Sequence, residues 1–368
     1  MPPNVSYSDI RADDLRRVTQ GRRSFWVSLL LMAVLIALTG AAVFMGWLAP
    51  LESFIPAQFW PAVQIVLALA PAGLWLLFFS VWERKNEGLR RAAFLLWLVT
   101  AALYLVTVSP LATHVFQVDD WLYVSWWSEL AGRFLILAPL EMFLLYLVLR
   151  YGVYPADVFQ TRTDGPIFGV AAALGVATMI SLLHARTPGF VSLDQGVLYV
   201  SEMALGYAVL GAWLGYFLGQ ARFKRTNIFY LAASFLLVVL LHALYFFALT
   251  FVNAQTYFLP SLDGLMMAGL VAIISFLLLY WRIRKGAKAF LHMAALVEIK
   301  EEAARPKSML ADVMHLVESN QLEVRPSPPP PPPLQSGGDG RDEADELESL
   351  KNNWESLIAE QEADNDAV

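Results

Sequence analysis

The stretch "LLVVLLHALYFFALTF", residues 236–251, decides the fold class of this chain. It is apolar apart from His242 near its middle, and the apolar run around it is long enough to cross a bilayer core of about 30 Å as a helix. Such runs recur along the 368 residues, of which 57% are hydrophobic and only 16% are charged. A soluble domain carries roughly a quarter of charged residues. We therefore predict an all-α fold, a polytopic membrane helical bundle of about eight transmembrane helices.

Apolar runs place these helices along the chain. We expect them at about residues 24–47, 59–82, 92–116, 129–151, 165–184, 196–220, 228–252 and 262–281. Arginine and lysine gather in alternate connections, beginning with the polar N-terminal segment, which is too long for the charged region of a secretory signal. By the positive-inside rule both termini are then cytoplasmic, in agreement with an even number of helices. The chain has no cysteine, which excludes disulfides and thiolate metal sites.

The residues beyond the last apolar run differ in composition. A basic and then acidic stretch with helical spacing is followed by "RPSPPPPPPLQSGGDG", which favours an extended and then flexible linker. The acidic end carries apolar residues at helical spacing, a pattern typical of a segment that folds into a partner's groove. These candidate partner-binding residues are Leu347, Leu350, Trp354, Leu357 and Ile358. The alternative is a solvated acidic tail.

This organisation divides the chain into six parts. They are residues 1–23, a cytoplasmic segment; 24–116, three transmembrane helices; 129–283, a five-helix membrane core; 284–322, a juxtamembrane amphipathic helix; 323–340, a Pro/Gly-rich linker; and 341–368, an acidic tail with an amphipathic helix.

Ionisable residues inside the spans are the candidates for function, because each is costly in lipid unless it is paired or hydrated. Glu141, Glu202 and His242 are the candidates here. Glu141 and His242 lie at similar depth and are expected to form a buried hydrogen-bonded pair. That pair is open to three interpretations: a structural link between helices, a ligand or proton-transfer role, or half of a metal site. Arg133 follows Glu129 by four residues, which predicts an ion pair on one helix face.

From residue 135 to 247 the order of motifs resembles the PrsW-type intramembrane protease family, part of the CAAX-protease-like membrane superfamily. The matching segments are "APLEMFLLY", "TRTDGPIFGVAAALGVATMISLL", "SEMALGYAVLGAWLG" and "HALYFF". In the second segment Asp164, Gly165, Gly169 and Gly175 stand at the family spacing, and small side chains there allow a neighbouring helix to approach closely. We expect Asp164 to be the N-cap of that helix. The resemblance implies a location in the bacterial cell membrane.

The active-site positions depart from the family pattern. Counted from Pro139, the paired glutamates fall on Met142 and Phe143 and the lysine on Tyr146, so that Glu141 is one place early, a rotation of about 100° on a helix. In the later segments Val176 stands where the family has phenylalanine. Apolar residues stand where the family has glutamate, histidine and aspartate; these are Ile180, Met203 and Phe246. His242 survives, which suggests the remnant of an active site that now links helices. Water activation needs a base or a metal in a hydrated pocket.

Three functions therefore stay open. The first is a catalytically degenerate relative that binds a transmembrane client and, through its tail, a cytosolic partner. The second is an active intramembrane endopeptidase or metalloprotease that uses Glu141, Glu202 and His242. The third is a transporter or channel component. We expect contacts with membrane lipids and no cofactor, metal or nucleic acid.

Overall fold

The computed structural model describes residues 7–83, 86–156, 158–161, 163–185, 192–223, 227–255 and 262–285. These residues form helices and turns with no strand among them. The chain divides into a unit up to Leu296 and a second unit, Val297–Val368. The expected juxtamembrane helix lies, apart from its first residues, outside the described ranges. The linker, the acidic tail and its partner-binding residues lie wholly outside them.

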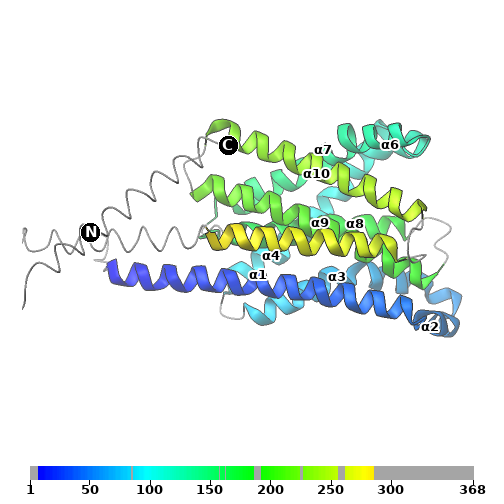
Figure 1. Ribbon diagram of the computed structural model, residues 1–368, viewed down its shortest axis with the longest axis horizontal. Helices are drawn as coiled ribbons and strands as arrows, with labels where there is room; N and C mark the ends of the chain where they lie inside the picture. The colour runs from blue at the N-terminus through cyan, green and yellow to red at the C-terminus, as the bar shows by residue number, and fades with distance from the viewer. Residues whose placement is uncertain are drawn as a thin grey trace, which may run out of the picture. The chain divides into compact units, whose positions relative to one another are not determined.

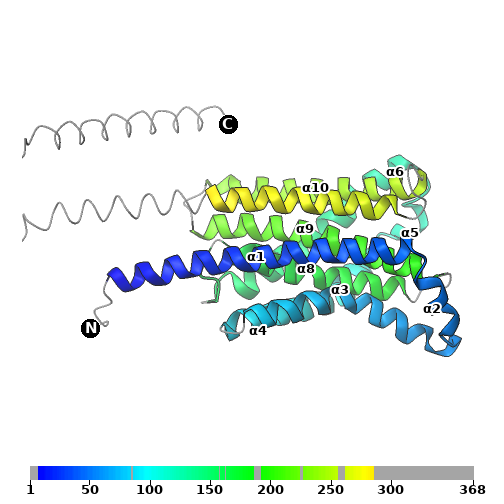
Figure 2. The same ribbon diagram turned by 60° about the horizontal axis from the view of Figure 1, so that its bottom comes forward.

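Within the described ranges eight helices are long and apolar enough to cross a membrane, which agrees with the predicted number. The spans are Trp26–Phe44, Trp60–Trp82, Glu87–Val115, Trp126–Val153, Asp164–His184, Leu193–Phe223, Phe229–Ala254 and Asp263–Lys285. They run side by side along one direction in the two views (Figures 1 and 2). The first span is the end of α1 (Tyr7–Phe44), which begins within the N-terminal segment that we had expected to precede the membrane helix.

The elements of the spans and of the connections between them follow the chain in order. They are α1, α2 (Leu48–Phe54), η1 (Ala57–Phe59), α3 (Trp60–Trp82), α4 (Glu87–Leu103), η2 (Tyr104–Val108), η3 (Leu111–Val115), α5 (Val118–Trp121), α6 (Trp126–Gly132), η4 (Arg133–Leu137), α7 (Ala138–Leu147), η5 (Val148–Val153), α8 (Asp164–His184), α9 (Leu193–Phe223) and α10 (Ile228–Gln255). The last span, Asp263–Lys285, follows α10. α4 begins five residues earlier than we expected because the side chain of Asn86 accepts a hydrogen bond from the backbone N–H of Leu89 and caps the helix.

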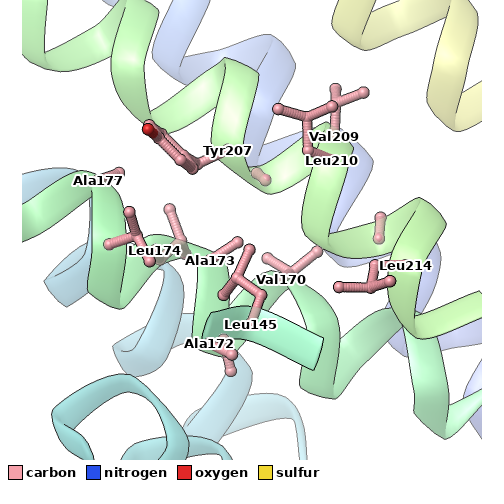
Figure 3. Close-up of a cluster of buried hydrophobic side chains, with 14 of the residues drawn as sticks. Leu145, Val170, Ala172, Ala173, Leu174, Ala177, Tyr207, Val209, Leu210 and Leu214 are labelled. Carbon is pink, nitrogen blue, oxygen red and sulfur yellow. The ribbon is translucent and has the colours of Figure 1, made fainter. Parts of the chain in front are cut away.

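α8 and α9 form the centre of the bundle and lie in its middle in both views (Figures 1 and 2). Glycines allow this close packing. A Cβ atom added to Gly169 would lie 1.9 Å from the carbonyl oxygen of Gly211, and one added to Gly215 would lie 2.0 Å from that of Gly165. The two backbones therefore touch directly, as small residues permit in membrane helices. On either side of these glycines, Val170 of α8 lies toward Leu214 of α9, and Leu174 of α8 lies toward Tyr207 of α9 (Figure 3).

The remaining helices surround this pair. α3 and α4 pack on α8, α1 packs on α3 and α9, and α10 packs on α9 and α7. The last span adjoins α1, since a Cβ at Gly269 would lie 3.2 Å from Ile36.

Four π-helical turns interrupt the third and fourth spans, and the described residues contain none elsewhere. They are η2, η3, η4 and η5. A π turn holds one residue more than an α turn and often occurs at functional sites. In these two spans the π turns therefore change which side chains face the interior of the bundle, compared with an uninterrupted α-helix of the same sequence.

The loop before α8 corrects one prediction. Asp164 is the first residue of α8 rather than its N-cap. Its carboxylate accepts hydrogen bonds from the backbone N–H groups of Gln160 (2.9 Å) and Thr161 (2.7 Å) and from the Thr161 hydroxyl (2.8 Å). The side chain points back and closes the preceding loop, because those N–H groups have no helical partner.

Candidate functional site

Glu141 is the centre of a buried polar cluster within the bundle. It lies in the first turn of α7, two residues after Pro139, and its side chain is only 5% exposed. Its Oε2 atom lies 2.7 Å from Nε2 of His242 on α10 and accepts a hydrogen bond from the Tyr207 hydroxyl of α9. Its Oε1 atom accepts a longer bond, 3.4 Å, from the Tyr104 hydroxyl of η2. One carboxylate therefore connects four spans.

His242 is enclosed even more completely, with a side chain 2% exposed. The distance to Glu141 is that of an ion pair, but the imidazole N–H does not point at the oxygen as in an aligned hydrogen bond. The predicted pair is thus present with a different geometry. Nδ1 is buried without a hydrogen-bond partner among the described residues. Tyr207 and Phe246 lie around the ring, with centroids 5.7 and 4.7 Å from it.

Tyr104 and Tyr207 were not among the candidates from the sequence. Both are almost fully buried, at 8% and 2% exposed. In the sequence, a tyrosine in the middle of a span looks like one more apolar residue, because its ring is hydrophobic. When it is buried, however, its hydroxyl requires a hydrogen-bond partner. That requirement, taken with Glu141 at similar depth, is the signal that could have identified them.

Glu202 lies apart from this cluster. It accepts a hydrogen bond from the side-chain amide of Asn253, at 3.2 Å, and its Oε1 atom lies next to Gly264 at the start of the last span. Asn253 follows His242 by eleven residues on α10, which is about 16 Å along a helix. The structure therefore brings together two of the three candidate residues and leaves the third about three turns away.

Arg133 and Glu129 form the predicted ion pair, with 2.9 Å between Nε and Oε1. Both side chains are only 10% exposed, so the pair is buried. Arg133 also donates to the Thr250 hydroxyl of α10 at 2.9 Å, and its guanidinium lies 5.9 Å from the centre of the Phe246 ring. The pair thereby joins the fourth span to α10 on one side of the His242 cluster.

Several positions that we compared with the family motif carry apolar side chains. Met142, Val176, Met203 and Phe246 are all buried. Phe143 is 52% exposed on the outer surface of the bundle. These residues offer neither a base nor a hydrogen-bonding group for water.

The donor set does not suit zinc, which takes three or four ligands at catalytic and structural sites. Within the described ranges, no three His, Asp or Glu side chains lie close enough together to hold a metal ion. Around His242 the further oxygens belong to one carboxylate and two tyrosines. We therefore derive no catalytic step through a metal.

A groove of about 820 Å³ lies between the third and fourth spans, beside this cluster. Leu140 and Leu144 of α7 line it, whereas Glu141 does not. The third span contributes a row from Gly88 to Leu111. The groove is thus separated from the polar cluster by the wall of α7.

Comparisons with known proteins give consistent relatives. A protein named Protease PrsW from Geobacillus kaustophilus (strain HTA426) is 31% identical over 181 residues, covering 48% of this chain and 73% of the relative. Another of that name, from Halalkalibacterium halodurans, is 30% identical over 184 residues, covering 49% of this chain and 80% of the relative. A third, from Bacillus subtilis (strain 168), is 31% identical over 138 residues, or 36% of this chain and 60% of the relative. No family model and no solved structure matches the chain.

Proposed function

Because the chain belongs to the PrsW protease family, we propose that it is a bacterial membrane member that binds transmembrane clients and does not cleave them. The observation that carries the proposal is the enclosed carboxylate of Glu141. Its oxygens contact His242, Tyr104 and Tyr207, all of them buried. A general base must instead reach the water from which it takes a proton.

The surroundings of the pair argue in the same direction. A buried water needs room and two to four polar partners. Next to His242 the neighbours are the rings of Tyr207 and Phe246, and the motif positions Met142 and Met203 are apolar and buried. Such an environment favours a dry structural link among four spans over a hydrolytic centre.

A protease has two tasks, to bind a protein and to cut it, and the proposal keeps only the first. The relatives are named proteases, and a protease binds a protein before it cuts one. Loss of an accessible base removes the second task and leaves the first, because helices associate in membranes by packing. The exposed apolar face of the last span, with Leu270, Ile274 and Leu277, offers a surface for such packing.

The proposal is tested by comparing cells that produce the native chain, Glu141→Gln or His242→Ala. Mass spectrometry of the membrane fraction would identify new protein N-termini, and cross-linking would capture clients. We expect the same N-termini in all three and client capture by the native chain. Glu202→Gln is the matched control, since Glu202 is also a buried glutamate of the spans. N-termini that appear with the native chain and the control, and vanish with the other two variants, would refute the proposal.

An active protease is the second candidate, and one observation favours it. Nδ1 of His242 lacks a partner among the described residues while Nε2 lies against Glu141. A small rotation of the imidazole would align its N–H with the carboxylate and leave the second nitrogen free, which is the arrangement of a base oriented by a third group. The experiment above decides between the two candidates.

We also propose that the ends of the spans near Arg91, Arg150 and Arg222 face the cytoplasm, with both termini on that side. The distribution of basic residues supports this orientation.

We propose that the acidic tail recruits a cytosolic protein through the apolar residues around Trp354, which the sequence predicts to fold as an amphipathic helix on binding. Its support is the helical spacing of apolar residues in a strongly acidic segment. Ending the chain after Pro333 should remove specific cytosolic proteins from the purified sample. An unchanged set of co-purified proteins would contradict the proposed role.

A further inference from the structure

The groove between the third and fourth spans begins at a positively charged end. Arg91 is the only charged side chain among its lining residues. The two spans adjoin there, since a Cβ at Gly88 would lie 3.1 Å from Val158, and one at Gly152 would lie 3.6 Å from Leu96. Beyond Arg91 the lining is apolar, and its Thr107 hydroxyl already donates to the carbonyl of Leu103 at 2.6 Å.

Two further arginines border this end of the groove. Arg222 donates to the carbonyl oxygen of Ala156, a lining residue, at 3.3 Å. Its second terminal nitrogen, Nη1, is buried without a partner among the described residues. Arg150 lies 3.9 Å from the centre of the Tyr154 ring, and Arg222 lies 5.5 Å from it. Two cations, one from η5 and one from α9, thus lie within about 6 Å of the centre of the Tyr154 ring.

Three acidic side chains lie near this end of the bundle: Glu83, which is buried and has contacts of its own, Glu87 and Asp164. Glu87 pairs with Arg91 at 2.7 Å, but both side chains are exposed, at 63% and 74%. Asp164 uses both carboxylate oxygens to close its own loop through residues 160 and 161. Arginine side chains therefore border the end of an apolar groove, while Glu87 and Asp164 are engaged in contacts of their own.

We infer that this site binds an anionic phospholipid, with its phosphate at Arg91, Arg150 and Arg222 and an acyl chain in the groove. The groove extends from Arg91 to Leu103 over about 18 Å at 1.5 Å per residue. That length is close to half of a bilayer core of about 30 Å. The near half of the groove thus accommodates one chain from one leaflet. The inference does not depend on whether the protein binds or cleaves clients.

Charge decides between a lipid and a protein helix as the occupant. A transmembrane helix of another membrane protein carries Lys and Arg at its cytoplasmic flank. On the proposed orientation those residues would meet the three arginines and repel them. A phosphate group is attracted to the same arginines, and basic pockets between transmembrane helices are known to suit lipid headgroups. Free phosphate would satisfy the cations but would leave the apolar groove unfilled.

The test uses the full-length chain in detergent. Native mass spectrometry would measure retention of phosphatidylglycerol, with phosphatidylcholine and glycerol phosphate as competitors. We expect the native chain to retain phosphatidylglycerol, phosphatidylcholine to compete weakly, and glycerol phosphate not to displace the lipid. Arg91→Gln/Arg150→Gln should weaken retention by about 25-fold, at roughly fivefold for each arginine near the membrane surface.

Matched variants separate this site from general attraction to anionic lipid. Arg282→Gln/Arg284→Gln removes two exposed charges from the last span and should leave retention unchanged. Leu95→Trp fills the groove and should reduce retention, whereas Leu278→Trp on the outer face of the last span should not. Equal loss in both arginine pairs, equal competition by phosphatidylcholine, or displacement by glycerol phosphate would overturn the inference.

Discussion

Replacing Gly169 by alanine should force α8 and α9 apart. The new Cβ would lie 1.9 Å from the carbonyl oxygen of Gly211, whereas ordinary contacts begin at 3.4 Å. The backbones must separate locally by about 1.5 Å, which is the difference between these two distances. No side chain can rotate away to relieve the contact, because the obstacle is backbone on a central helix.

The cost follows from two opposed effects. Overpacking in a well-packed core costs typically 1–3 kcal/mol, and a backbone obstacle places this substitution at about 3 kcal/mol. Exchange of glycine for alanine in a helix returns about 1 kcal/mol. We therefore expect Gly169→Ala to lower the free energy of unfolding by about 2 kcal/mol. Gly73→Ala on α3 has no atom within 4 Å of the new Cβ and should be neutral or stabilising by up to about 1 kcal/mol.

Both variants would be unfolded in mixed micelles with an increasing fraction of sodium dodecyl sulfate and followed by helix content. Gly169→Ala should unfold at a lower fraction than the native chain, and Gly73→Ala should not. If the two variants unfold together, the close approach of α8 and α9 does not stabilise the bundle and the reasoning fails.

Three other predictions use the same assay or simple labelling. Arg133→Gln should lower the free energy of unfolding by about 3 kcal/mol, because it leaves the buried carboxylate of Glu129 unpaired. Arg91→Gln removes one partner of an exposed pair of the same spacing and should lower it by less than about 1 kcal/mol. Equal losses would contradict the conclusion that the Arg133–Glu129 pair is buried. Glu141→Ala should lower the free energy of unfolding by about 2–4 kcal/mol, because it leaves the buried hydroxyls of Tyr104 and Tyr207 without their hydrogen-bond acceptor. Glu141→Gln keeps one acceptor oxygen and should cost less. The reverse order would mean that hydrogen bonds accepted by residue 141 do not stabilise the cluster. Since the chain has no cysteine, single cysteines at Glu87 and Val124 would report orientation by labelling in intact cells, and we expect only the second to react with an impermeant reagent.

The fold was predictable because long apolar runs have one stable form in lipid. Each expected span is present, and its ends differ from the expected residues where local hydrogen bonds set them, as the cap at Asn86 does for α4. The π turns were not predictable, because hydropathy does not distinguish an α turn from a turn with one more residue. Likewise, the direction in which Asp164 points depends on unpaired N–H groups of the preceding loop.

The candidate site was predictable in part. Glu141 and His242 could be paired from their depth in two spans, and they lie 2.7 Å apart. Glu202 could not be separated from them by depth alone, since the partner it binds, Asn253, is an ordinary polar residue near the end of a span. The tyrosines were missed because their rings count as apolar in a hydrophobic run.

The π turn η4 lies directly before α7 and has a consequence for how such chains diverge. One additional residue in an α-helix would rotate everything downstream by about 100°, whereas a π turn takes up that residue within one turn. A single codon gained or lost at this point can therefore be accommodated while the side chains downstream, Glu141 among them, keep facing the same neighbours. Residue-by-residue matching across η4 then ceases to follow position in space, although the apolar length of the span hardly changes.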